Sequence, residues 1–378
     1  MIRITHIISG LERGGAESTL KKLLQNLDRD AFQCDVISLS SIGVVGAELQ
    51  QLGFDVVALE MNPNHLQLGK LISLVRHLRQ RRPDVVQTWM YHADLLGGIA
   101  AKLARVPALA WNIRHSDLNH FSDKRRTRLI AQSCALLSRF VPDKIVCCAE
   151  SARQNHIAMG YSAKPMLVID NGFDTELFAP DQQARLALRT SLQVPSNVPL
   201  IGLVARVHPQ KGHDVFLKAA AQIVTDDIAA HFLLCGQGAS AANVQLQHQL
   251  TQLNLVNRVH LLGERDDMPS IQAALDVACS ASVVSEGFSN TIGEAMSCAV
   301  PCVVTNVGES ARIVGATGWI VEPGDSQALS AALVAAISLE EHDYSRRSSA
   351  ARARIIEHYG LSKAVAAYAR TYRDMASP

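Results

Sequence analysis

The stretch Leu200-Ile-Gly-Leu-Val-Ala-Arg-Val-His-Pro-Gln-Lys-Gly212 indicates the class of fold. Its first six residues form a short apolar run that is typical of a buried strand, and a polar loop follows directly. Along the rest of the chain, short runs rich in Val and Ile alternate in the same way with longer segments of helical period. This alternation is typical of βαβ units and predicts an α/β protein with parallel sheets.

Two series of strands are predicted on either side of a segment rich in turn formers. The first series lies near residues 2–8, 35–39, 55–59, 84–88, 108–112, 144–148 and 166–169. The second series lies near residues 200–205, 231–235, 258–262, 276–280, 301–304 and 318–321. Each series has the pattern of a doubly wound sheet, which binds ligands at the carboxyl ends of its strands.

The length of 378 residues suggests two or three domains. We predict a linker over residues 170–199, because residues 170–180 are rich in turn formers and Pro195 and Pro199 follow them. We therefore predict a first domain over residues 1–180, a second over 181–355, and a helical tail from about 356 to 378. If the two sheets face each other, their loops bind the ligand in the cleft between them.

The composition is that of an ordinary globular protein. Apolar residues make up 48%, charged residues 19%, and the net charge is +1, which disfavours disordered, collagen-like and nucleic-acid-binding tails. The eight cysteines lie in apolar strings without a C-x-x-C pair, so we expect buried thiols in a reducing cytoplasm. Neither a signal peptide nor a membrane span is recognised, so we expect any membrane contact to be peripheral.

Two loops contain residues suited to binding phosphate. Gly14 and Gly15 precede an amphipathic helix, and such glycines let the backbone and the helix N-terminus approach an anion. Their spacing is not G-x-G-x-x-G, which disfavours a nicotinamide site, and a glycine turn without a ligand stays open. Arg206 and Lys211 follow a predicted strand and suit one diphosphate, although solvated surface charge explains either residue alone equally well.

The most informative segment begins at Glu286 and reaches Pro301. Ser289 or Asn290 suits the N-cap of a helix that places Glu294 about one turn inside it. Backbone N–H groups of residues 287–292 then suit a phosphate, while the two glutamates suit sugar and ribose hydroxyls. For Glu294 alone, an acid stabilised by the helix dipole is the favoured explanation.

These motifs together resemble the retaining glycosyltransferases of family four, which have the GT-B fold. The resemblance depends on Glu286-Gly-Phe-Ser-Asn-Thr-Ile-Gly-Glu294-Ala-Met, with seven residues between its glutamates, on the loop at 205–212, and on Gly14-Gly-Ala-Glu17. It extends to members that build bacterial surface polysaccharides. It implies two Rossmann-like domains facing across a cleft, an N-terminal acceptor domain, a C-terminal donor domain, and a C-terminal helix that packs back on the first. Ala299 and Glu309 depart from the family pattern.

The resemblance also implies roles for individual residues. His115 and Glu286 are assigned to catalysis, and Gly14 and Gly15 to the acceptor and diphosphate loop. The donor is assigned to Arg206, Lys211, Gly287, Phe288, Ser289, Asn290 and Glu294. Breaking a sugar–phosphate bond leaves a more negative nucleotide diphosphate, which preorganised cations stabilise. We therefore expect neither a metal nor another cofactor, and Asp28-Arg-Asp30 is interpreted as a polar turn.

The predicted activity is the transfer of a hexose from a nucleotide sugar, most simply a UDP-sugar, to a glycan or polyprenyl-diphosphate-linked acceptor. A GT-B sugar-nucleotide epimerase and a non-catalytic nucleotide-sugar-binding protein stay open as alternatives. The basic cluster Lys124, Arg125, Arg126 and Arg128 opens a helix, where cations oppose the dipole. It suits an anionic membrane or a lipid diphosphate, although solvated surface charge is the favoured explanation. We expect a cytoplasmic protein that works at the inner face of the membrane and binds no nucleic acid.

Overall fold

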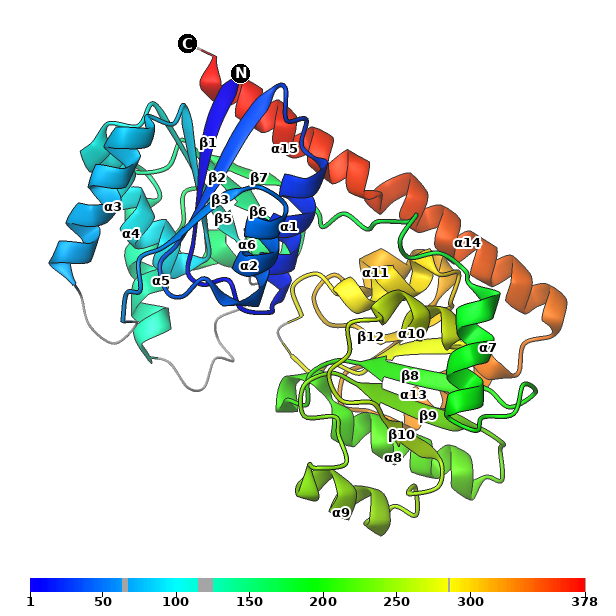
Figure 1. Ribbon diagram of the computed structural model, residues 1–378. Helices are drawn as coiled ribbons and strands as arrows, with labels where there is room; N and C mark the ends of the chain where they lie inside the picture. The colour runs from blue at the N-terminus through cyan, green and yellow to red at the C-terminus, as the bar shows by residue number, and fades with distance from the viewer. Residues whose placement is uncertain (63–66, 115–124, 285, 378) are drawn as a thin grey trace. The chain divides into compact units, whose positions relative to one another are not determined.

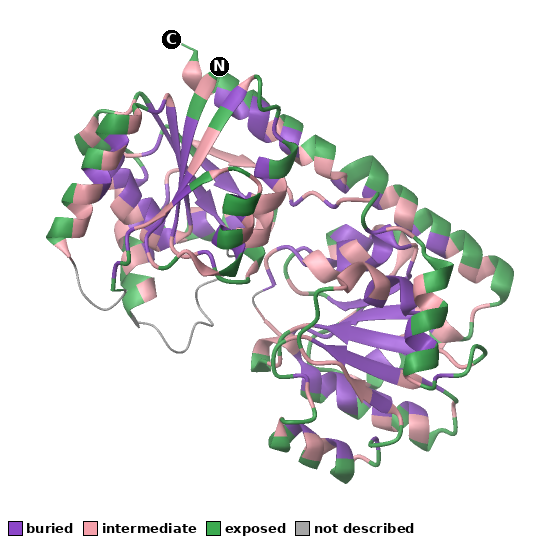
Figure 2. Ribbon diagram, viewed as in Figure 1, coloured by how far each residue is buried: buried purple, intermediate pink, exposed green. Residues whose placement is uncertain are grey.

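The chain forms two compact units, each built around one parallel sheet (Figure 1). The computed structural model describes residues 1–62, 67–114, 125–284 and 286–377. Unit 1 comprises Met1–Gly172 and Ser362–Pro378, and unit 2 comprises Phe173–Leu361. Figure 2 shows that the strands of both sheets are largely buried, as expected for parallel sheets with helices on both faces.

The sheet of unit 1 has seven strands in the order β3-β2-β1-β4-β5-β6-β7. These are β1 (Ile2–Ile8), β2 (Phe32–Ser38), β3 (Asp55–Ala58), β4 (Val85–Trp89), β5 (Ala108–Ile113), β6 (Lys144–Cys147) and β7 (Met166–Val168). All strands of the first predicted series are confirmed. The order reverses between β1 and β4, which are neighbours, so the loops after these two strands open a crevice.

The sheet of unit 2 has six strands in the order β10-β9-β8-β11-β12-β13. These are β8 (Leu200–Val204), β9 (His231–Cys235), β10 (Val259–Leu261), β11 (Val277–Ser280), β12 (Cys302–Thr305) and β13 (Trp319–Val321). The second predicted series is confirmed as well. Here the order reverses between β8 and β11, which places the loops after them side by side.

Helices connect the strands in both units. Unit 1 contains α1 (Gly15–Asn26), α2 (Gly43–Gln51), α3 (Leu68–Arg81), α4 (Tyr91–Ala104), α5 (Arg125–Leu137), α6 (Glu150–Ala158) and α15 (Leu361–Ala376). Unit 2 contains α7 (Gln182–Ser191), α8 (His213–Thr225), α9 (Val244–Gln252), α10 (Met268–Ala274), α11 (Asn290–Ser297), α12 (Ser310–Val314), α13 (Ser326–Ile337) and α14 (Glu341–Tyr359), with 3-10 turns η1 (Pro209–Lys211) and η2 (Gly315–Thr317). In the described part of the chain, no helix is long and apolar enough to cross a membrane.

The predicted linker over residues 170–199 is too long, because it contains α7. The Asp181 side chain caps this helix by accepting a hydrogen bond from the Ala184 N–H at 2.9 Å. Arg189 of α7 is buried and pairs with Asp276 at 2.8 Å, which ties the helix to unit 2. The prolines and turn formers on either side obscured a helix of only 10 residues.

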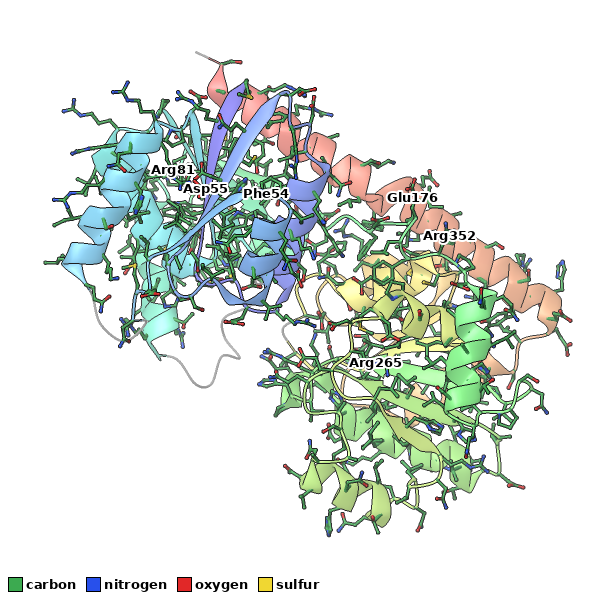
Figure 3. The ribbon with its side chains drawn as sticks, viewed as in Figure 1. Phe54, Asp55, Arg81, Glu176, Arg265 and Arg352 are labelled. Carbon is green, nitrogen blue, oxygen red and sulfur yellow. The ribbon has the colours of Figure 1, made fainter. Side chains whose placement is uncertain are left out.

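The border between the units also differs from the predicted residue 180. Phe173 stacks on Phe288, with ring centroids 5.9 Å apart, and its N–H donates to the Tyr359 carbonyl at 2.8 Å. Arg352 of α14, labelled in Figure 3, donates to the carbonyls of Thr175 and Phe178 at 3.0 and 3.1 Å. These contacts attach the chain from Phe173 onward to unit 2.

The predicted tail helix over 356–378 is two helices, α14 and α15, which meet at Gly360. α15 belongs to unit 1, where Tyr368 accepts a hydrogen bond from Asn112 at 3.0 Å and Tyr372 donates to Gln87. Both tyrosines are buried, and burial lowers the pKa of the nearby His6 to about 3. The first sheet thus packs against a neutral, hydrogen-bonded face of α15.

The cysteines agree with the prediction of buried thiols. All eight are free, and only Cys34 is half-buried rather than buried. Burial raises the pKa of the Cys34 thiol to about 12 and that of Cys235 to about 11, so both stay protonated at neutral pH. These side chains therefore contribute to packing.

Candidate functional site

The loops after β8 and β11 bring a cation and a carboxylate together in unit 2. Lys211 Nζ lies 2.5 Å from Glu286 Oε2, and the Ser282 hydroxyl donates to the same oxygen at 2.8 Å. Glu286 is buried, whereas Lys211 is half-buried. Its ammonium group has three N–H donors, so it can bind a second anion while it holds Glu286.

Two glycines with positive φ hold these loops in place. A Cβ on Gly212, whose φ is +64°, would lie 1.9 Å from the Ala281 carbonyl oxygen, so the loop carrying Lys211 packs directly on the chain after β11. A Cβ on Gly308, whose φ is +57°, would lie 1.6 Å from the Glu286 carbonyl oxygen. Only glycine allows both the backbone conformation and this close approach.

The residues after Glu286 lead into α11, whose N-cap is Ser289. The Gly293 N–H makes a long backbone hydrogen bond to the Ser289 carbonyl, at 3.4 Å. N–H groups in the first turn of a helix have no acceptor within the helix and favour anions. The first turn of α11 therefore supplies backbone donors, and this helix begins four residues after Glu286.

Phe288 supports this loop through its side chain. The ring is buried between Phe173 and Tyr359, with a centroid distance of 5.6 Å to Tyr359. Gly293 of α11 packs on Phe173, because a Cβ there would lie 2.0 Å from that ring. The aromatic side chain of Phe288 thus packs inside unit 2. Only the backbone of Phe288 is left to contribute to the predicted donor loop.

Two other predicted donor residues of unit 2, Arg206 and Glu294, are also described by the structure. Arg206 is exposed, and its side chain has no hydrogen bond or ion pair to any residue that the structure describes. Glu294 is half-buried on α11, one turn beyond the N-cap. Burial lowers the pKa of His213, beside Lys211, to about 4, so that imidazole is neutral at pH 7.

The two departures from the family pattern have local explanations. Ala299 follows α11 with φ +59°, the left-handed conformation in which glycine is less strained. Glu309 is buried, its N–H donates to the Gly287 carbonyl at 3.3 Å, and its carboxylate pairs with Arg312. Glu309 thereby supports the loop after Glu286.

The remaining predicted residues belong to unit 1. Gly14 is the N-cap of α1 and Gly15 its first residue, at the carboxyl end of β1. His115 lies outside the described residues, as does Lys124 of the basic cluster. Among the described side chains, no group of three or more His, Cys, Asp and Glu residues is placed to hold a metal ion.

Arg114 is a further residue of this region, and no sequence motif predicted it. Its guanidinium donates to Thr19 Oγ1 at 2.9 Å and to Asn171 Oδ1 at 2.5 Å, and it lies 5.9 Å from the Trp89 ring centroid. Thr19 is on the second turn of α1, so Arg114 positions the helix that follows Gly14. The sequence feature that could have indicated Arg114 is its position directly after a buried strand and before His115.

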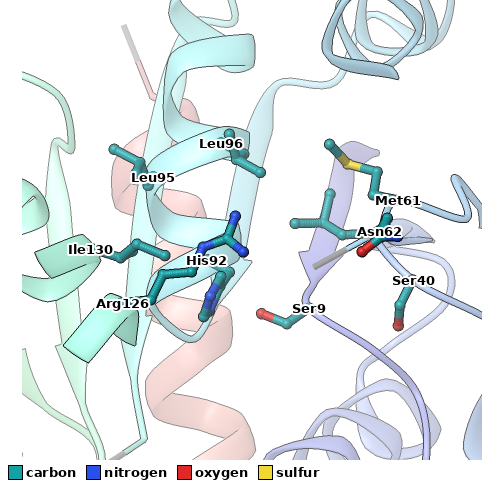
Figure 4. Close-up of a pocket in the computed structure, with 10 residues that line it drawn as sticks. Ser9, Ser40, Met61, Asn62, His92, Leu95, Leu96, Arg126 and Ile130 are labelled. Atoms are coloured by element: carbon teal, nitrogen blue, oxygen red, sulfur yellow. The ribbon is translucent and has the colours of Figure 1, made fainter. Parts of the chain in front are cut away.

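A pocket of about 390 Å³ lies where the strand order of unit 1 reverses (Figure 4). Its apolar wall consists of Leu39, Met61, Leu95, Leu96 and Ile130, and its polar groups come from Ser9, Ser40, Asn62, His92 and Arg126. Figure 4 shows Arg126 and His92 together on one side of this pocket. Met90, just before α4, has φ +72°, and such backbone strain often marks a functional loop.

Comparison with known proteins identifies the family. The model for Glycosyltransferase Family 4 matches residues 13–177, and the model for glycosyl transferases group 1 matches residues 198–338. The UDP-Gal:alpha-D-GlcNAc-diphosphoundecaprenol alpha-1,3-galactosyltransferase of Escherichia coli is 28% identical over 82% of this chain and 80% of its own length. The putative glycosyltransferase EpsF of Bacillus subtilis (strain 168) is 25% identical over 80% of this chain and 79% of its own length.

Solved structures agree with this assignment. Anabaena HepE in complex with UDP has a TM-score of 0.87 and 25% identity, with 99% of this chain and all of that chain covered. A glycosyltransferase from Rickettsia africae has the same fold, with a TM-score of 0.83 and 19% identity over 99% of this chain and 98% of its own. The chain therefore belongs to the family 4 glycosyltransferases and has their GT-B fold.

Proposed function

We propose that this glycosyltransferase moves a hexose from a UDP-sugar to a polyprenyl-diphosphate-linked glycan, with retention of configuration and without a metal ion. The observation that carries the proposal is the Lys211–Glu286 pair at the reversal point of the second sheet. Two relatives support the substrates: HepE binds UDP, and the Escherichia coli enzyme acts on a sugar-diphosphoundecaprenol. The reaction belongs to polysaccharide biosynthesis on the cytoplasmic side of a membrane.

The donor site is proposed to act on the leaving group. Lys211, Arg206 and the N-terminus of α11 face the diphosphate, and Glu294 accepts hydrogen bonds from the ribose hydroxyls. Glu286 and the backbone of residues 287–290 hold the transferred sugar. Because the leaving UDP gains negative charge in the transition state, these positive groups stabilise it more than the ground state.

In the proposed reaction, the bond between the anomeric carbon and the diphosphate oxygen breaks, and its electron pair stays on that oxygen. The acceptor hydroxyl attacks the same face of the sugar, forms the new C–O bond and transfers its proton to the departing phosphate oxygen. His115 is proposed to lie at the reacting centre and Glu286 to stabilise the positive sugar ring. The products are UDP and the extended glycan.

The pocket of unit 1 is proposed to bind the acceptor. Its volume of about 390 Å³ lies in the range of small-molecule sites. Arg126 and His92 suit the acceptor diphosphate, and Leu95, Leu96 and Ile130 suit the first isoprene units. This combination of a cation and an apolar wall matches a prenyl diphosphate.

A panel of nucleotide sugars, with and without a short-chain prenyl-diphosphate sugar, tests the activity. We expect release of UDP from one UDP-hexose that depends on the acceptor and persists in EDTA. The anomeric configuration of the product, read by NMR, should equal that of the donor. Epimerisation without acceptor, or binding without turnover for every acceptor, would contradict transferase activity toward these substrates, and full loss in EDTA would contradict the metal-free mechanism.

Arg126→Ala is expected to raise KM for the prenyl-diphosphate acceptor about tenfold or more, because a charged hydrogen bond is worth about 1.5–3 kcal/mol. The affinity for UDP should stay at the parental value, since Arg126 lines the pocket of unit 1. Arg128→Ala is the matched control, because Arg128 is exposed on the same helix and does not line the pocket. Steady-state kinetics with a short-chain acceptor should separate the two variants, and equal KM values would refute the assigned acceptor site.

A further inference from the structure

Arg114 connects the end of β5 to the loop that precedes α1. Its guanidinium donates to Thr19 Oγ1 at 2.9 Å, and the Thr19 hydroxyl in turn donates to the Gly15 carbonyl at 2.8 Å. Gly15 belongs to the loop assigned to the acceptor and the diphosphate. Because hydrogen bonds in a chain polarise one another, the bond from Arg114 strengthens the bond to Gly15. Arg114 therefore reaches the backbone of this loop through a single side chain.

The guanidinium of Arg114 is fixed on its other sides as well. The amino group that binds Thr19, Nη2, also donates to Asn171 Oδ1 at 2.5 Å, and the guanidinium lies 5.9 Å from the Trp89 ring centroid. The second amino group, Nη1, is buried and makes no hydrogen bond to any residue that the structure describes. Because Nη2 is engaged by two protein acceptors and Nη1 is buried, the geometry favours positioning over direct contact with a substrate.

Tyr368 of α15 lies beside Arg114. Its ring stacks on Trp89, with centroids 6.3 Å apart and planes 22° from parallel, and its hydroxyl accepts a hydrogen bond from Asn112 at 3.0 Å. Asn112 and Arg114 are two residues apart, which is the spacing that places side chains on one face of an extended chain. Burial raises the pKa of the Tyr368 hydroxyl, and the charge of Arg114 opposes this rise. The hydroxyl of Tyr368 is thus close to the guanidinium, and Trp89 packs against both residues.

We propose that Tyr368 positions Arg114, and that Arg114 acts through Thr19 to position the loop of Gly14 and Gly15 for the acceptor. The inference deepens the proposed function, on which it rests, because it assigns control of the acceptor loop to a residue of the C-terminal helix. Tyr368, Arg114 and Thr19 are positioning residues, since the substrate contacts are assigned to other groups. Misplacement of a binding loop by about 1 Å can lower a rate about 100-fold, so this relay has a measurable effect on transfer.

Tyr368→Phe tests the first step of the relay, because it removes the hydroxyl and keeps the ring that stacks on Trp89. We expect kcat/KM for a short-chain prenyl-diphosphate acceptor to fall about tenfold, while the affinity for UDP stays at the parental value. Tyr372→Phe is the matched control, because Tyr372 is similarly buried on the same helix and its hydroxyl donates to Gln87. Both variants should melt at similarly lowered temperatures, but Tyr372→Phe should keep the parental kcat/KM.

Substitutions of Thr19 and Arg114 test the second step. Thr19→Val replaces the hydroxyl by a methyl group and should lower kcat/KM about tenfold, whereas Thr19→Ser keeps the hydroxyl and should have the parental value. Arg114→Lys should lower kcat/KM about 100-fold, because a compact ammonium does not reproduce the geometry that holds Thr19 and Asn171. Addition of Tyr368→Phe to Arg114→Lys should cause no further loss, since Tyr368 acts through Arg114. Multiplied losses in the double variant would overturn the relay.

Hydrogen–deuterium exchange of the full chain, followed by mass spectrometry, tests the relay without any substrate. The amides of α1 should exchange faster in Tyr368→Phe and in Thr19→Val than in the parent, and Tyr372→Phe should leave them unchanged. Parental exchange of α1 in the first two variants, or equal changes in Tyr368→Phe and Tyr372→Phe, would overturn the positioning proposal. If the exchange result holds but the parent transfers sugar to none of the acceptors, that failure counts against the proposed function instead.

Discussion

Lys211→Ala is expected to weaken binding of UDP about 10- to 100-fold and to lower kcat further. A hydrogen bond to a charged group contributes about 1.5–3 kcal/mol, and removal of Lys211 also leaves the buried Glu286 without the cation that lies 2.5 Å away. The unpaired carboxylate would then repel the diphosphate. The effect on kcat arises because the lost charge stabilises the leaving group in the transition state.

Isothermal titration with UDP, followed by transfer assays, measures this effect. Lys218→Ala is the matched control, because Lys218 is an exposed lysine on α8, the helix that follows Lys211. It should bind UDP and transfer sugar like the parent. If Lys211→Ala binds UDP with the parental affinity while its fold is intact, the donor site is not at the reversal point of the second sheet.

Gly308→Ala is expected to lower kcat/KM about 100-fold while unit 2 stays folded. A Cβ at this position would lie 1.6 Å from the Glu286 carbonyl oxygen, so one of the two loops must move. Misplacement of a binding loop by about 1 Å can cost about 100-fold in rate. The left-handed conformation adds a smaller cost of about 1–2 kcal/mol in stability.

Gly324→Ala separates these two contributions. Gly324 has φ +83°, but no atom lies within 4 Å of the Cβ it would gain. Both variants should therefore melt below the parental temperature, and Gly308→Ala alone should lose most of its transfer activity. Equal kcat/KM for the two variants would show that the contact between Gly308 and Glu286 does not position the site.

The strands were predictable because their signal is local. Each is a short apolar run between turn formers, and this pattern does not depend on which strands pair. α7 was missed because a short helix between prolines and turn residues gives a weak periodic signal. The border at Phe173 was also missed, because it depends on contacts with Phe288 and Tyr359, which are far away in the chain.

In the candidate site too, the sequence determined local features, and the fold determined contacts between distant residues. The sequence by itself determined the residue types: a lysine after one strand, glutamates around a helix N-terminus, and glycines where chains approach closely. It could not show that Lys211 and Glu286 pair, since 75 residues separate them. Only the tertiary structure decided this, because β8 and β11 become neighbours in the sheet and bring their loops together.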